Sequence, residues 1–88
     1  MKVKDFLEER GYSFVEFETG TDGGWFYALA YAKDKEGATW AVSLTPLKPT
    51  QEPVKVYAVS QDTEEDNRII AEVPWEQYTI FSTEASAQ

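Results

Sequence analysis

Histidine and cysteine are both absent from the 88 residues of this chain. The chain therefore lacks the side chain that most often acts as a general base near neutral pH, the thiolate nucleophile and most transition-metal ligand sets. The lack of cysteine also excludes disulfides, which favours a reducing compartment over a secreted scaffold. No apolar run reaches the roughly 18–20 residues of a membrane span, and no apolar leader follows Met1. We therefore expect a soluble, cytoplasmic protein that is not an enzyme and holds no metal or cofactor.

Positive charge is scarce: eight Lys and Arg stand against sixteen Asp and Glu, which gives a net charge of −8. Proteins that bind nucleic acid or anionic membranes gain affinity by neutralising phosphates with cations, so this balance argues against both as direct partners. The acids are concentrated late in the chain. Residues 61–88 carry seven acids and one base, Arg68, whereas residues 1–60 carry nine acids and seven bases. Any protein partner of this region is expected to be basic.

The remaining composition is that of a folded domain. Hydrophobic residues make up 42% of the chain and aromatic residues 15%, which is too apolar for a disordered sequence. The length allows one hydrophobic core and no more. We expect a single domain over residues 1–81 and, because residues 82–88 are small and polar, a disordered tail after it.

Hydrophobic periodicity predicts one helix followed by strands. Val3, Phe6 and Leu7 have the i, i+3, i+4 spacing of an amphipathic helix over residues 2–10, and Gly11 stands where a helix commonly ends in a left-handed residue. From Tyr12 onward the period is two, which is typical of strands. We predict strands at residues 12–18, 25–33, 38–45, 54–60 and 68–73, turns at 19–24 and 34–37, a proline-rich connection at 46–53, an acidic loop at 61–67, a helical turn at 75–78 and a last extended piece at 79–81.

These elements predict an α+β fold: a short N-terminal helix followed by an antiparallel meander of four to five strands. The meander is expected to remain open or to curl into a half-open barrel or roll, with the helix over one face or end. Residues 25–33 are apolar at both odd and even positions. This pattern indicates a central strand that is covered on both sides or faces a partner.

Three features invite a catalytic or ligand-binding interpretation, and each has a simpler one. Glu16 and Glu18 are two positions apart on a strand, so their carboxylates lie on one face about 6.5–7 Å apart, a spacing that suits acid–base catalysis on glycosidic bonds. A solvent-facing polar stripe explains them better. The glycine-rich segment 20–24 precedes a strand rather than a helix, so it is a hairpin turn and not a phosphate loop. The acids of residues 62–66 lack the spacing of a calcium loop.

The C-terminal acids predict a binding surface for a basic partner. If the loop at 61–67 joins paired strands, its acids and two later glutamates should lie along one side of the sheet, where they can imitate phosphates and steer a cationic protein. Trp75 is a candidate apolar anchor, since tryptophan is enriched in binding hot spots. The predicted site comprises Asp62, Glu64, Glu65, Asp66, Glu72, Trp75 and Glu76. The alternative is a solvated loop that only aids solubility.

The functional hypothesis is a non-enzymatic acidic module that inhibits a nucleic-acid-binding protein or nuclease by occupying its basic surface. In composition, though not in any motif, the chain resembles the broad class of phage or plasmid inhibitors and toxin-immunity proteins. The alternative is a small accessory subunit that oligomerises through an aromatic sheet face, so either a monomer or a homodimer is expected. That face is the aromatic strand Trp25–Tyr31. Under either hypothesis, exposed interface anchors are expected among Trp25, Tyr27, Tyr31, Tyr57, Trp75 and Tyr78.

Overall fold

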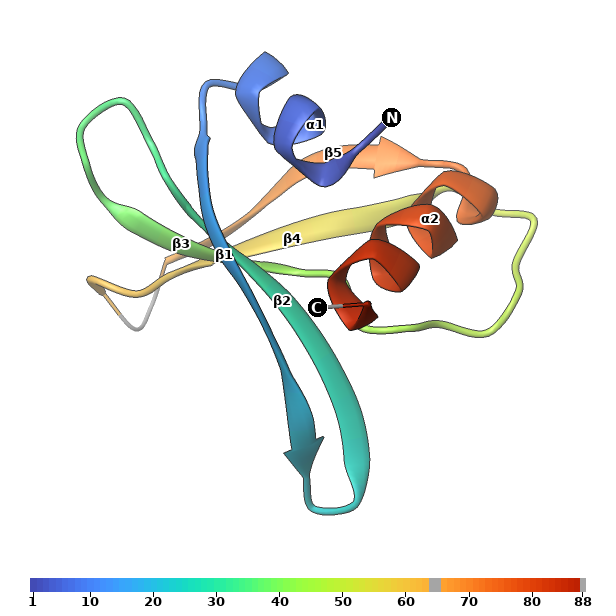
Figure 1. The fold of residues 1–88 in the computed structure, drawn as a ribbon. Helices are drawn as coiled ribbons and strands as arrows, with labels where there is room; N and C mark the ends of the chain where they lie inside the picture. Colours follow the sequence, from blue (N-terminus) through green and yellow to red (C-terminus); the bar gives the residue numbers. More distant parts are fainter. Residues whose placement is uncertain (64–65, 88) are drawn as a thin grey trace.

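The sequence folds into one five-stranded antiparallel sheet with a helix at each end of the chain (Figure 1). The computed structural model describes residues 1–63 and 66–87. Neighbouring strands follow one another in chain order, and the sheet is not closed into a barrel. The predicted α+β meander is therefore confirmed. The elements are α1 (Val3–Glu9), β1 (Ser13–Asp22), β2 (Trp25–Lys33), β3 (Thr39–Ser43), β4 (Val54–Ser60), β5 (Asn67–Val73) and α2 (Trp75–Ser86).

Helix α1 ends as its sequence predicts. Gly11 has φ +86°, a backbone conformation that only glycine adopts without strain. At the other end, Lys2 provides no side-chain cap, and the N–H of Val3 instead donates to Oε2 of Glu84 in α2 at 3.0 Å. A helix of seven residues is too short to be stable alone, so it depends on this contact and on its packing.

The first hairpin is longer than predicted. Strand β1 continues through residues 19–22, which we had expected to form a turn, and only Gly23 and Gly24 connect it to β2. Both glycines have positive φ, +60° and +85°. Two consecutive residues of this kind form the tight turn that matches the twist of a hairpin, so the ladder extends to Asp22. Figure 1 shows the tip of this hairpin projecting beyond the rest of the fold.

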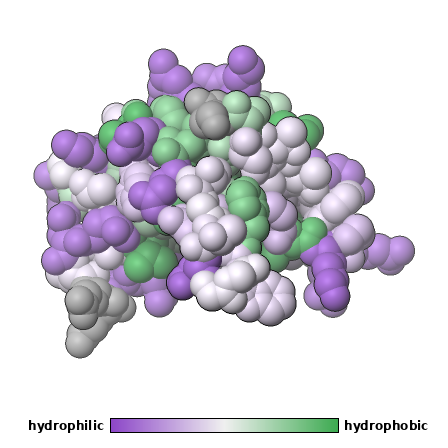
Figure 2. All heavy atoms as spheres, turned by 60° about the horizontal axis from the view of Figure 1, so that its bottom comes forward, coloured by the Kyte–Doolittle hydropathy of each residue, from purple (hydrophilic) through white to green (hydrophobic). Residues whose placement is uncertain are grey.

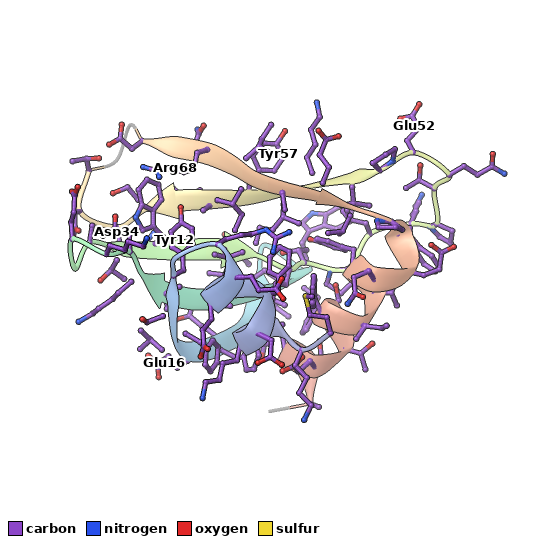
Figure 3. The ribbon with its side chains drawn as sticks, turned by 90° about the horizontal axis from the view of Figure 1, so that it is seen from above. Tyr12, Glu16, Asp34, Glu52, Tyr57 and Arg68 are labelled. Atoms are coloured by element: carbon purple, nitrogen blue, oxygen red, sulfur yellow. The ribbon has the colours of Figure 1, made fainter. Side chains whose placement is uncertain are left out.

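Burial alternates along the strands, because both helices cover the same face of the sheet. In β4, the side chains of Val54, Val56 and Ala58 are buried, whereas those of Tyr57 and Val59 are exposed. Figure 3 shows α1 and α2 on one side of the sheet and Tyr57 pointing to the other. The side that the helices do not cover therefore meets solvent.

The C-terminal prediction was wrong. Instead of a helical turn, an extended piece and a disordered tail, residues 75–86 form α2. Tyr78, Phe81, Ser82 and Ala85 are all buried, and their i, i+3, i+4, i+7 spacing is that of one helix face. The small residues that looked like a tail let the helix approach the sheet closely. There Ser82 Oγ donates to the carbonyl of Leu44 at 2.7 Å.

The two helices meet over the sheet through an aromatic contact. The rings of Phe6 in α1 and Phe81 in α2 have centroids 4.7 Å apart at an interplanar angle of 49°. Both side chains are almost completely inaccessible to solvent, and they join a single core with residues from all five strands. This core unites the two ends of the chain.

The other boundaries agree within a few residues. Strands β2 and β4 have the predicted bounds, β5 begins one residue early, and β3 ends at Ser43 instead of residue 45. Beyond Ser43, the Thr45 hydroxyl bonds both the N–H and the carbonyl of Ala28, so a side chain continues the ladder. Among the residues described, no helix is long and apolar enough to cross a bilayer.

We predict that Phe81→Ala lowers the free energy of unfolding by about 3–5 kcal/mol, because it leaves a cavity between α1, α2 and the sheet. Total stability at this chain length is roughly 4–13 kcal/mol, so the variant should unfold at much lower urea concentration. Ile80, the neighbour on the same helix, has 51% of its surface exposed. Ile80→Ala should change stability by less than about 0.5 kcal/mol. Equal urea midpoints for the two variants would exclude a docked α2.

We also predict that Gly11→Ala costs about 1 kcal/mol, because alanine is strained at positive φ. A Cβ at this position would also lie 3.2 Å from Cε of Lys35, which must move slightly. Thermal melting of the two proteins checks the difference. An unchanged melting temperature would contradict the left-handed end of α1.

Candidate functional site

The face of the sheet opposite the helices carries an unusual number of apolar and aromatic side chains. We call this surface the uncovered sheet face, and we define it by the strand positions that alternate with the buried ones. The space-filling view, which brings the end of the fold with the β1–β2 hairpin tip forward, shows hydrophobic groups reaching the surface between hydrophilic ones there (Figure 2). The uncovered sheet face includes Glu16, Glu18, Trp25, Tyr27, Leu29, Tyr31, Lys33, Lys55, Tyr57, Val59, Ile69 and Glu72, and also Ala41, which is itself buried.

Its aliphatic part lies on β4 and β5. Tyr57 and Ile69 are direct cross-strand partners, and 45% and 47% of their surfaces are exposed. Val59 is also exposed, and it pairs across the sheet with Ala41 of β3. Exposed contiguous apolar groups of this kind mark an interaction surface more often than chance scatter does.

The aromatic part lies on the β1–β2 hairpin and is organised by one carboxylate. The hydroxyls of Tyr27 and Tyr31 each donate to a different oxygen of Glu18 at 3.1 Å. Gly20, the cross-strand partner of Tyr27, leaves room for the tyrosine ring, since a Cβ there would lie 2.9 Å from the hydroxyl. Trp25, at the hairpin tip, has 80% of its surface exposed. The rings of Tyr27 and Tyr31 are thus fixed in orientation, and the exposed indole of Trp25 lies on the same strand.

The carboxylate also changes the acidity of the phenols. The hydrogen bond to Glu18, and then its negative charge, raise the pKa of Tyr27 above its ordinary value. For Tyr31, burial is the larger cause of the raised pKa and the same hydrogen bond is the second. Both phenols therefore stay neutral and keep donating to Glu18 over the physiological pH range. Because both oxygens of Glu18 are occupied, the arrangement favours a structural use of this carboxylate over catalysis with Glu16.

The predicted loop acids lie at the turn between β4 and β5. Asp62 is exposed, and its Oδ2 accepts the N–H of Thr39 at 3.2 Å. Asp66 is exposed and accepts the Thr63 hydroxyl at 2.9 Å. Their side chains thus stabilise the loop while remaining accessible. Glu64 and Glu65, also predicted, lie outside the described residues.

The remaining predicted acids lie at the opposite end of β5. Glu72 is exposed on the uncovered sheet face, where its cross-strand partner is Lys55. Glu76 is exposed in the first turn of α2. Strand β5 rises about 3.3 Å per residue, so about 17 Å separates Asn67, where the strand leaves the loop, from Glu72. The predicted carboxylate surface is therefore divided into two groups, one at the β4–β5 turn and one at the other end of β5. In the second group, Glu72 lies beside the cation of Lys55.

Of the two candidate anchors near the C-terminus, Trp75 is partly accessible to a binding partner and Tyr78 is not. Trp75 is half-buried against the core, and its indole N–H already donates to the carbonyl of Leu47 at 3.2 Å. Tyr78 is buried, and its hydroxyl donates to the carbonyl of Thr45 at 2.9 Å. Tyr78 is therefore a core residue, contrary to its place among the possible exposed anchors.

The aliphatic residues Val59 and Ile69 were not among the predicted site residues. Their alternation with buried neighbours is visible in the sequence, but which side of the sheet is bare depends on where α2 packs. Because α2 was not predicted, the uncovered side could not be identified. Among residues 1–63 and 66–87, no group of three or more acidic side chains is arranged to hold a metal ion.

We predict that Glu18→Gln lowers the pKa of Tyr27 and Tyr31 toward ordinary values, because the charge and one hydrogen-bond acceptor are lost. Raised folded-state pKa values add stability that is fully present below the unfolded pKa of about 10 and is lost as pH rises through the folded values. The free energy of unfolding of the variant should therefore fall less as the pH rises through this range. Tyrosine Cζ NMR titration measures each pKa separately. Glu16→Gln is the control: its charge raises only the pKa of Tyr31, as the smallest contribution. Identical titrations in both variants would contradict the hydrogen bonds from Tyr27 and Tyr31 to Glu18.

Comparisons with known proteins add no assignment: no family model, no curated protein and no solved structure matches this chain.

Proposed function

We propose that this protein is a non-enzymatic module that binds a positively charged protein through the uncovered sheet face. The observation that carries the proposal is the exposed apolar cluster of Tyr57, Val59 and Ile69 on β4 and β5, with Glu72 on the same face. Protein interfaces have this composition, with aromatic and apolar groups at the centre and a polar rim. The charge of −8 then sets the sign of the partner.

The aromatic residues supply the expected anchors. Trp25 and Tyr57 present large surfaces with few rotatable bonds, so they lose little conformational entropy on binding. The tyrosines bound to Glu18 are already fixed in the free protein, which reduces the ordering cost further. A partner that covers this face would bury the apolar groups that the helices leave in water.

The charge favours a basic partner over a second copy of the chain. Two copies, each with net charge −8, repel one another, and stacking two uncovered faces would bring their acidic rims together. A cationic partner is instead attracted, and association should accelerate at low ionic strength. The exposed loop acids Asp62 and Asp66 extend the negative field beyond the sheet.

The partner class that we favour is a nucleic-acid-binding protein or nuclease, because such proteins present dense Lys and Arg surfaces. The exposed acids Asp62, Asp66 and Glu72 offer anionic groups to such a surface, whereas both oxygens of Glu18 are occupied by tyrosine hydroxyls. Occupation of the surface would exclude nucleic acid by competition. The protein would then act as an inhibitor.

The experiment identifies a partner and then tests the face with a matched pair of variants. Protein captured from host lysate after nuclease treatment is purified, and its binding to this chain is measured by surface plasmon resonance. Ile69 on the uncovered face and Ile80 on α2 have similar exposures, 47% and 51%. We predict that Ile69→Ser weakens binding at least about tenfold and that Ile80→Ser changes it less than about twofold. Equal effects, or a partner that is not basic, would contradict the proposal.

Charge reversal tests the contribution of the acidic loop separately. The triple variant Glu64→Lys, Glu65→Lys, Asp66→Lys should slow association and flatten its salt dependence while the protein still folds without the Thr63–Asp66 hydrogen bond of the loop. Unchanged association would restrict the binding surface to the sheet. The capture experiment could instead recover only this chain, as a salt-resistant dimer. If Ile69→Ser dissociates that dimer, the result would support the alternative, an accessory subunit that oligomerises through the same face.

A further inference from the structure

Basic side chains gather at one hollow of this acidic protein. A cavity of about 270 Å³ lies between the end of α1, the β2–β3 turn and the start of β5. Arg10, Lys35 and Arg68 line it, which is three of the eight Lys and Arg in the chain, and two acids, Asp34 and Glu36, line it as well. Figure 3 shows Tyr12 and Arg68 close to Asp34 at one end of the fold, away from Tyr57. The cavity is therefore distinct from the uncovered sheet face.

Arg68 is held in place without an ion pair. Its guanidinium carbon lies 3.9 Å from the centroid of the Trp40 ring, and its Nη1 donates to the Tyr12 hydroxyl at 3.3 Å. No carboxylate of residues 1–63 or 66–87 forms a salt bridge with it. A guanidinium has five N–H donors, so most of those on Arg68 have no protein acceptor within the described parts of the chain. Stacking fixes the plane of the guanidinium and leaves those donors available.

Asp34, the acid beside Arg68, is already occupied. Its Oδ1 accepts the N–H groups of Glu36 and Ala38 at 2.9 and 3.0 Å, and its Oδ2 accepts the indole N–H of Trp40 at 3.0 Å. The bond from Trp40 is the main cause of the lowered pKa of this carboxyl. Asp34 therefore stays ionised and orients Trp40, on which Arg68 stacks. The charge of Arg68 also lowers the pKa of Asp34, but no salt bridge joins the two side chains.

Two further donors border the cavity. Lys35 extends over Gly11, since a Cβ at Gly11 would lie 3.2 Å from Cε of Lys35 and 4.0 Å from its Nζ. The Tyr12 hydroxyl accepts from Arg68, so its own hydrogen can be donated to a ligand. Arg10 is held toward its own helix, because its Nη1 donates to the carbonyl of Phe6 and lies 3.7 Å from a Glu9 oxygen. It contributes mainly positive potential.

We propose that this cavity binds the phosphate group of a small ligand. Arg68 would donate two N–H groups to phosphate oxygens, Lys35 would add its ammonium, and Tyr12 would donate its hydroxyl. A planar fork and a point charge are the two recurring elements of phosphate recognition. The donors come from the connection between α1 and β1, the β2–β3 turn and β5, so they approach an oxyanion from several sides. The site requires no chemistry at the ligand and no metal.

The test is an NMR titration with inorganic phosphate at constant ionic strength, observed in the tryptophan indole N–H signals. Trp40 reports on the cavity through its contacts with Asp34 and Arg68, whereas Trp25 and Trp75 are internal controls. We expect a saturable shift of the Trp40 signal with a dissociation constant on the order of 1 mM, and little shift of the other two.

Matched variants keep the result decisive. Arg68→Gln removes the stacked guanidinium but also alters packing on Trp40, so Lys35→Gln, on an exposed side chain, is the second variant. Each should weaken phosphate binding at least about fivefold. Lys48→Gln, an exposed lysine of the proline-rich connection, should not change it. A Trp40 shift that never saturates, that chloride reproduces, or that persists unchanged in Lys35→Gln would overturn the proposal. Equal affinity for acetate would show a general carboxylate site and would also reject phosphate specificity.

Discussion

Packing of both helices on the same face of the sheet is the constraint on which the rest of the structure depends. Phe6 and Phe81 come from opposite ends of the chain, yet their ring centroids lie 4.7 Å apart inside the core. Around them, the strands contribute small or branched side chains such as Ala30 and Val56, so the helices can approach closely. A chain of this length has material for one such layer and no third layer to cover the other side of the sheet.

The bare side of the sheet follows from that packing, and the proposed binding function rests on it. The strands place Tyr57 and Ile69 on this side because residues alternate between the two faces. Glu18 then turns two of the hairpin tyrosines into a fixed unit by accepting both hydroxyls. An apolar surface bordered by carboxylates, on a chain with twice as many acids as bases, is suited to a cationic protein.

Sequence patterns were informative where one short-range rule decides the structure. Alternation alone placed β2 and β4 at their observed bounds, and Gly11 marked the end of α1. Helix α2 was missed because Ser82 and Ala85 are small, which reads as a tail unless their i+3 spacing is recognised as a close-packing face. The bulges near Phe14 and Val56 also have no clear sequence signal, and they decide which residues of β1 and β5 face outward.

The candidate sites were less predictable than the fold, because they depend on long-range geometry. The predicted acids form one dense run in the sequence, but β5 separates Asp66 from Glu72. Arg68 meets Tyr12 from 56 positions away, and no local pattern relates the two. A residue type and its spacing can predict a face of a strand. They do not predict which other segment covers that face.

The most direct test of the account is the solvent exposure of the sheet, measured by NMR relaxation in the presence of a neutral, soluble gadolinium chelate. The account predicts strong relaxation enhancement for the side chains of Tyr57 and Ile69, weak enhancement for Val56 and Ala58, and the same pattern on dilution. Equal protection of Tyr57 and Val56 in dilute solution would mean that another segment covers the face. That result would contradict a bare sheet and the binding function built on it.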